Sequence, residues 1–132
     1  MPSLDEGTPL FVQIAGQLAD DIVDGQLTEG TRVPSTNELA AFYRINPATA
    51  AKGINMLVDE GVLEKRRGIG MFVADGAREQ LLAARRKLFA EQYVGPMVAE
   101  ANRLGIDNDT LVSLVKETSA NNASANNGGK TR

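Results

Sequence analysis

Two helix-start patterns, eleven residues apart, constrain the fold of this chain more than any other feature. Ser35 is followed three positions later by Glu38, which is the pattern of a capping box. Asn46 is followed by Pro47, which combines a favoured N-cap residue with the residue favoured at the first helical position. We therefore predict two short capped helices, over 36–43 and about 47–60, separated by a turn of three residues.

The residues directly after these helices predict a two-stranded ribbon with a basic tip. The segments 62–64 and 71–73 are short strand candidates, and the two glycines between them permit a tight turn. Lys65, Arg66 and Arg67 lie beside those glycines. A helix-turn-helix places its second helix in the major groove of DNA, and a basic ribbon beside it could contact the flanking phosphates. This stretch therefore indicates a reader of duplex DNA.

Helical periodicity continues on both sides of this stretch. Apolar residues at helical spacing predict a first helix from residue 9 to about 25, with Thr8 as its N-cap. A longer helical pattern runs from about 77 to 104 and is interrupted at Gly95-Pro96, where a kink or break is expected. A last helix is predicted over about 109–118.

The predicted fold class is mostly α with a small β-hairpin: a winged helix-turn-helix followed by a C-terminal helical dimerisation segment. Residues 1–75 form the predicted DNA-binding domain. Residues 76–118 form the helical segment for dimerisation, which is also a candidate for effector binding. Residues 119–132 are polar and of low complexity, which predicts a disordered tail.

Composition excludes several classes of function. The 132 residues contain no cysteine and no histidine, which removes disulfides, the commonest general base and the commonest metal ligand. No paired carboxylates indicate a catalytic cleft, so we expect neither an enzyme nor a cofactor or metal site. No apolar run approaches the roughly 20 residues that span a bilayer, and the first residues do not resemble a signal peptide. We therefore expect a cytoplasmic protein with no membrane partner.

The net charge of −3 is unevenly distributed along the chain. Residues 1–31 hold six acids and no bases, residues 32–87 hold ten bases and six acids, and residues 88–132 hold four bases and five acids. The segment with the helix-turn-helix and the ribbon is thus the only positive one. Because local potential decides DNA binding, the acidic total does not exclude it, but modest and salt-sensitive affinity is expected.

The first turns of the second capped helix offer side chains that could read bases. Asn46 could read adenine, Thr49 could contact a phosphate or a thymine methyl group, and Lys52 could contact a phosphate or guanine. The small side chain of Ala48 would allow close approach. On spacing alone the alternative is an ordinary helical hairpin with solvated polar positions, and a run of bases is usually a solvated turn.

A series of short motifs recurs in order along residues 8–74: Pro-Leu-aromatic, Gln-Ile, Gly-x-Leu, Gly-x-x-Val-Pro-Ser, Glu-Leu-Ala, Asn-Pro-x-Thr and Gly-x-Gly-x-Phe-Val. This order resembles the winged-helix domain of GntR-type bacterial transcription regulators. The Asn46-Pro47-Ala48-Thr49 form and the short C-terminal part resemble the YtrA-type subfamily, whose members carry two helices after the wing. The resemblance implies a DNA-binding regulator of transcription.

The resemblance also implies a set of DNA-binding residues in the two capped helices, the turn between them and the ribbon. These residues are Ser35, Thr36, Asn37, Arg44, Asn46, Ala48, Thr49, Lys52, Arg66, Arg67, Gly68 and Gly70. Two departures from the family pattern matter. The family usually has arginine at the positions of Asn37 and Pro47, so both departures weaken the direct transfer of its base contacts, and its operator sequence cannot be carried over to this chain.

The C-terminal helices would leave an apolar face uncovered in a monomer. That face comprises Leu81, Leu88, Val94, Val98, Leu111 and Leu114. Pairing with a second copy would bury it and place two recognition helices about one DNA turn apart, whereas folding back on the first helix is the alternative. A small-molecule effector pocket could be lined by Phe89, Tyr93 and Met97, which would otherwise be core residues.

Two hypotheses of function follow. The first is a homodimeric repressor that binds a double-stranded DNA operator and is modulated by a small molecule. The second is a winged-helix module for protein contact, with weak or lost DNA binding, which the acidic total charge and Asn37 favour.

Overall fold

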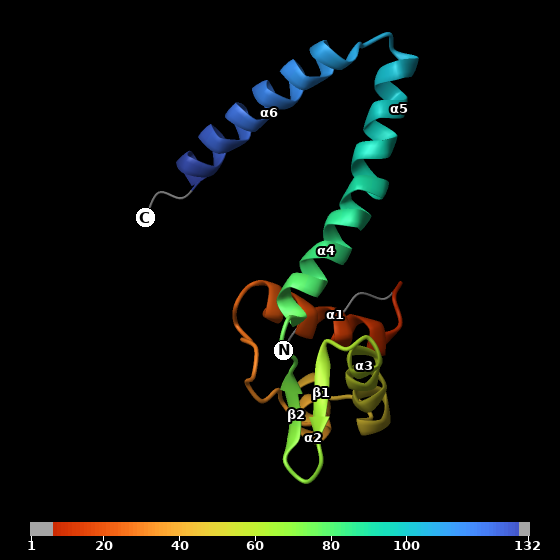
Figure 1. Cartoon of the computed structure of the whole chain (residues 1–132), viewed down its shortest axis with the longest axis vertical. Coiled ribbons are helices and arrows are strands. Elements are labelled where there is room, and N and C mark those ends of the chain that lie inside the picture. The colour runs from red at the N-terminus through yellow and green to blue at the C-terminus, as the bar shows by residue number, and fades with distance from the viewer. Residues whose placement is uncertain (1–6, 130–132) are drawn as a thin grey trace. The chain divides into compact units, whose positions relative to one another are not determined.

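The computed structural model describes residues 7–129, with side chains described through residue 125, and divides into two compact units (Figure 1). The first unit ends at Arg86 and the second begins at Lys87, and each is described by itself. The first compact unit therefore extends beyond the domain boundary predicted at residue 75. The reason is that the first turns of α4 (Ala77–Phe89) complete the core of the first unit, where Ala77 and Leu81 are buried.

Helix α1 (Leu10–Val23) lies at the centre of the first unit. Its buried face consists of Ile14, Ala15, Leu18, Ala19 and Ile22. The prediction of Thr8 as the N-cap is wrong, because Pro9 occupies that position and no side chain caps the helix. The Thr8 carbonyl oxygen instead accepts a hydrogen bond from Gln13 Nε2 at 2.7 Å. Gly25 follows the end of the helix with φ +85°, the left-handed conformation that glycine commonly adopts just after a helix.

Helices α2 (Thr36–Tyr43) and α3 (Pro47–Asp59) form where the cap patterns predict them. The Ser35 hydroxyl accepts from the Glu38 backbone N–H at 3.1 Å, and the Glu38 carboxylate accepts from the Ser35 N–H at 2.8 Å. The Asn46 side chain accepts from the backbone N–H two residues later at 2.8 Å. Both helix starts therefore satisfy backbone donors that would otherwise lack a partner.

The inner faces of α2 and α3 close the core against α1. Their buried residues include Leu39, Ala40, Tyr43, Ala50, Ile54 and Leu57, whereas Val58 is only half-buried. Gly53 is also buried. A Cβ atom at Gly53 would lie 2.8 Å from the Phe11 carbonyl oxygen, so glycine allows α1 and α3 to approach closely.

Strands β1 (Leu63–Arg66) and β2 (Gly70–Val73) form the predicted antiparallel hairpin. Leu63 pairs with Val73 and Arg66 pairs with Gly70, so three residues make the turn. Gly68 lies in that turn with φ +74°, in the left-handed region that favours glycine. We call this hairpin the wing.

A third extended segment lies along β2, and the sequence analysis did not predict this pairing. Arg32 forms an antiparallel bridge with Phe72, and the Val33 N–H donates to the Met71 carbonyl at 2.9 Å. The Gly30 N–H donates to the Val73 carbonyl at 2.8 Å. This segment leads directly into Ser35, so it fixes the start of α2 beside the wing.

In the second unit, α4 continues into a π-helical segment, η1 (Ala90–Val94), and then α5 (Gly95–Arg103). The interruption predicted at Gly95-Pro96 is confirmed, and it takes the form of a π-helical turn just before Pro96. Pro96 has no N–H to donate and its ring crowds the preceding turn, so the regular hydrogen-bond ladder changes there. The Gly95 N–H donates to the Ala90 carbonyl, five residues back.

Helix α6 (Asn108–Gly129) extends well beyond the predicted end at residue 118. Asp107 caps its start, since its Oδ1 accepts from the Thr110 N–H at 2.8 Å. The structure thus differs from the prediction of a disordered tail over 119–129. An established helix gains one hydrogen bond for each residue it adds, so a polar, alanine-containing segment can continue it. The rest of the predicted tail, 130–132, lies outside the described residues.

Candidate nucleic-acid interface

The start of α2 and the wing together form a notch of about 390 Å³. Ser35, Thr36 and Asn37 line it from the helix, and Arg66, Gly68 and Gly70 line it from the wing. The structure thus brings together six of the residues predicted to bind DNA. Its lining also contains the bases Arg32 and Lys65 but no acid, so a negatively charged ligand is favoured there. We call this site the α2–wing notch.

Arg32 is a candidate residue that the sequence analysis did not assign. Its Nε atom would lie 2.8 Å from a Cβ atom placed on Gly70, so the guanidinium rests against the wing backbone. Gly70 has φ +140°, a value that side chains rarely allow, and any side chain there would also displace Arg32. The signal in the sequence was that Arg32 begins the positive segment directly before the capped helices.

The bases of the wing differ in how they are held. The Arg66 guanidinium lies 4.1 Å from the centre of the Phe72 ring, and its Nε is 3.2 Å from Glu64 Oε2. Arg67 lies in the turn next to Gly68 and has no ion pair within the described residues. Arg66 is therefore oriented before any ligand arrives, whereas Arg67 is free to follow a phosphate.

The first turns of α3 present a second exposed surface. Ala48 and Lys52 are exposed, Thr49 is half-buried, and the Asn46 side chain serves as the helix cap. The Lys52 ammonium lies 4.2 Å from the centre of the Phe11 ring, which holds it against α1. Ala48 and Lys52 line a shallow hollow with Phe11, separate from the α2–wing notch.

Arg44 ends α2 and marks the turn of the helix-turn-helix. It is exposed and adopts a left-handed conformation with φ +58°, an uncommon conformation for a residue other than glycine. The Ile45 N–H donates to the Ala40 carbonyl at 3.0 Å, so the chain reverses within three residues. Arg44 does not line the α2–wing notch.

The predicted effector residues do not form one pocket. Met97 lines a hollow of about 390 Å³ between α5 and α6, together with apolar residues that include Leu111 and Leu114. Phe89 and Tyr93 do not line it, although their rings lie 5.5 Å apart. All three candidate side chains are exposed.

The capping box at Ser35 gives a testable pH dependence. Hydrogen bonds from the Ser35 backbone and side chain, together with the charge of Arg32, hold the pKa of Glu38 below its ordinary value of 4.5. The ionised carboxylate therefore contributes stability above about pH 4.5, and this contribution is lost as pH falls through the lowered folded-state pKa. We expect Glu38→Gln to lower the Tm at neutral pH, with the difference from wild type shrinking below about pH 4.5. Thermal unfolding followed by circular dichroism measures this, and a pH-independent difference would contradict it.

Helix-turn-helix geometry, an exposed recognition helix and a basic wing beside it define the winged-helix class of DNA-binding domain. The sequence profile "Bacterial regulatory proteins, gntR family" matches residues 10–73. The chain is 30% identical over 113 residues to the HTH-type transcriptional repressor YtrA of Bacillus subtilis (strain 168), which covers 86% of each chain. The chain therefore belongs to the GntR family, and it is a transcription regulator rather than an enzyme.

Solved structures agree with this assignment. A putative transcriptional regulator of the GntR family from Bacteroides thetaiotaomicron is 31% identical, with a TM-score of 0.72, over 86% of this chain and 98% of that one. The DNA-binding domain of AraR in complex with operator ORX1 is 29% identical, with a TM-score of 0.50, over 56% of this chain and 90% of that one. The predicted winged-helix fold is thus confirmed.

No helix within residues 7–129 is both long enough and apolar enough to cross a bilayer. Within the same range, no three or more acidic side chains gather closely enough to hold a metal ion.

Proposed function

We propose that the chain is a homodimeric repressor that binds a semi-palindromic operator in double-stranded DNA in the cytoplasm. The observation that carries the proposal is the α2–wing notch, whose lining contains Arg32, Lys65 and Arg66 and no acid. Phosphate oxygens favour such a surface, because its cationic side chains attract them and can donate hydrogen bonds to them. The base-reading residues are those at the start of α3, with Ala48, Thr49 and Lys52 foremost.

The AraR complex supports this proposal, since that winged-helix domain is described with its operator. The name of YtrA describes a repressor, and we propose that this chain also represses transcription. Repression would be steric, because a bound dimer occupies DNA that transcription requires. A small molecule that changes the relative position of the two DNA-binding domains in the dimer would then alter operator affinity.

Exposed apolar residues of the second unit support dimerisation. They are Leu88, Phe89, Tyr93, Val94, Met97, Leu104, Val112, Leu114 and Val115. A monomer rarely exposes so many large apolar side chains in one short segment, and a second copy would cover them. Leu81, which was expected on this face, is buried in the first unit and takes no part in it.

A footprint on the promoter region of its own operon tests the proposal. We expect protection of two half-sites about one DNA turn apart, and a mass in solution twice the 14.1 kDa of one chain. Leu114→Glu should shift the mass toward the monomer and weaken the footprint, because it places a charge on the apolar face. Ser113→Glu adds the same charge to the neighbouring position and should leave both unchanged.

The alternative is a winged-helix module that contacts another protein. Asn37 favours it, since this side chain lines the notch where the family usually carries an arginine. Equal affinity for promoter fragments and bulk DNA would favour this alternative over the repressor.

A further inference from the structure

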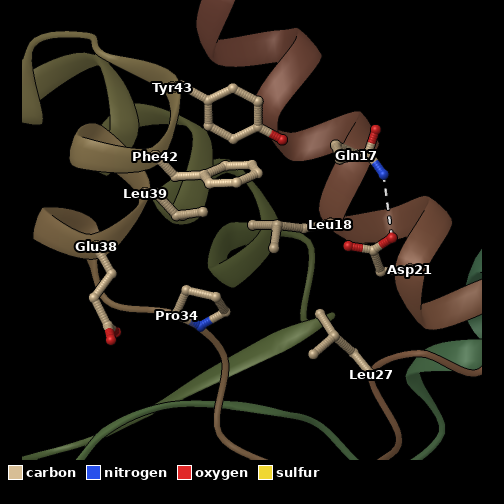
Figure 2. A pocket seen from close by; sticks show the side chains of 9 residues that line it. All are labelled: Gln17, Leu18, Asp21, Leu27, Pro34, Glu38, Leu39, Phe42 and Tyr43. Atoms are coloured by element: carbon tan, nitrogen blue, oxygen red, sulfur yellow. Dashed lines mark hydrogen bonds between the residues drawn. The ribbon is translucent and has the colours of Figure 1, made fainter. Parts of the chain in front are cut away.

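A hollow between α1 and α2 shares no lining residue with the α2–wing notch. Its volume of about 380 Å³ lies at the small end of the range for ligand pockets. Figure 2 shows Phe42 and Pro34 on the α2 side, Gln17 and Asp21 on the α1 side, and Leu18 between them. We call it the α1–α2 hollow.

The surface of the α1–α2 hollow is mostly apolar. Leu18, Leu39 and Tyr43 are buried beneath it, whereas the neighbouring Phe42 is 61% exposed. An exposed aromatic ring over a buried apolar floor offers a ligand both apolar contact and a π face. The rings of Phe42 and Tyr43 form a T-shaped pair with their centres 5.1 Å apart, and the exposed Phe42 side chain still offers much of its ring surface to a ligand.

Asp21 supplies the negative charge of the hollow. Its Oδ1 accepts a hydrogen bond from Gln17 Nε2 at 3.1 Å, and no cation pairs with it within the described residues. The adjacent Asp20, by contrast, pairs with Arg85 at 2.6 Å. Asp21 is half-buried in the last turn of α1, where the negative end of the helix dipole adds to its own charge. The Asp21 carboxylate therefore does not stabilise the helix through its dipole, and it forms no ion pair within the described residues.

The other polar groups of the hollow do not compete for this role. The Glu38 carboxylate is held by the Ser35 N–H, and in Figure 2 it points away from the other lining side chains. Burial, and then the charge of Asp21, raise the pKa of the Tyr43 phenol, which therefore stays neutral. No base lines the hollow. Its electrostatic preference is opposite to that of the α2–wing notch.

We propose that the α1–α2 hollow binds an organic cation with an apolar body. The cationic group lies at the Asp21 carboxylate and faces the ring of Phe42, and the apolar body covers Leu18 and Leu39. A carboxylate without a counter-ion and an exposed aromatic face both attract a cation, and neither attracts an anion. The site assigns a chemical class to the effector, and only this regulatory part rests on the proposed function.

The hollow and the notch are joined through the start of α2. Pro34 lines the hollow and directly precedes Ser35, which lines the notch. Glu38 lines the hollow and caps the helix through Ser35. A ligand that displaces the start of α2 therefore changes the surface offered to DNA. By linkage, the cation and the operator must then change each other's affinity by the same factor.

Binding to the full chain without DNA tests the site itself. We would titrate it with benzyltrimethylammonium, with benzyl alcohol as the neutral probe and with phenylacetate as the anionic probe, and follow backbone amide shifts by NMR. We expect shifts at the end of α1 and along α2, and affinity for the cation about tenfold higher than for the other two probes. Equal affinity for the three probes, or shifts elsewhere in the chain, would overturn the proposal.

Variants separate the two attractions. Asp21→Asn and Phe42→Leu should each lower the affinity for the cation about three- to tenfold. The first variant removes the negative charge, and the second removes the aromatic face but keeps an apolar contact. Asp24→Asn removes an exposed acid from the same end of α1 but outside the lining, and should change nothing. If Asp24→Asn weakens cation binding as much as Asp21→Asn does, the cation is attracted by the general negative charge at this end of α1, and the proposed site is overturned.

A separate measurement with operator DNA tests the coupling. We expect saturating benzyltrimethylammonium, but not benzyl alcohol, to change operator affinity at least about threefold in the wild type and not in Asp21→Asn. Unchanged affinity would overturn the coupling. Selective cation binding by a chain that binds no operator would overturn only the proposed function, whereas operator binding without cation selectivity would overturn only the site.

Discussion

Replacing Arg66 and Arg67 together by alanine is expected to weaken operator binding about ten- to a hundredfold at moderate salt. Arg66 is oriented by Glu64 and Phe72, and Arg67 lies at the turn with no ion pair in the described chain. Two phosphate contacts would be lost from each protomer, so the slope of log affinity against log salt should fall by about 2 per protomer. Fluorescence anisotropy with a labelled operator at several salt concentrations measures both quantities.

The matched control removes the same charge from elsewhere. Arg86→Ala/Arg103→Ala changes two exposed arginines that pair with Glu79 and Glu100 and that line neither proposed DNA surface. It should leave operator affinity within about twofold, because both arginines are exposed, already pair with a carboxylate and belong to neither proposed DNA surface. An equal loss in both double variants would mean that net charge, and not the wing, determines binding.

The elements that the sequence predicts well are those determined by neighbours in the chain. The starts of α2 and α3 are confirmed because a capping box and an Asn-Pro start involve residues at most three positions apart. The wing is confirmed for the same reason, since two glycines and short strands determine a tight hairpin. Six of the predicted DNA-binding residues meet in one notch, but there the local patterns do not suffice, because the bridge between Arg32 and Phe72 holds the start of α2 beside the wing.

The features that sequence reasoning missed depend on contacts between distant residues. The side chain of Arg32 reaches the wing only through the bridge to Phe72, and Leu81 enters the core only because α4 packs on the first unit. Periodicity alone could not separate such a core residue from one on a free apolar face. The α1–α2 hollow also depends on such contacts, because no sequence pattern links Asp21 with Phe42.

The close approach of α1 and α3 gives the second large expected effect. Gly53→Ala should lower the free energy of unfolding by about 1–3 kcal/mol, although alanine favours a helix over glycine. The added Cβ would lie 2.8 Å from the Phe11 carbonyl oxygen and 3.3 Å from the Cγ2 atom of the fully buried Ile14. A backbone oxygen cannot rotate away as a side chain can, so the two helices must separate.

Gly16→Ala provides the control, because it makes the same chemical change within α1 where nothing lies within 4 Å of the new Cβ. It should raise the free energy of unfolding by about 0.5–1 kcal/mol through the loss of unfolded-state freedom. Urea unfolding followed by circular dichroism compares the two variants, and equal stability would contradict the close approach. Because α3 is the proposed recognition helix, Gly53→Ala should also weaken operator binding at temperatures where it remains folded. Gly16→Ala should leave operator binding unchanged. Comparing the two variants therefore separates the effect of a displaced recognition helix from that of a change in stability alone.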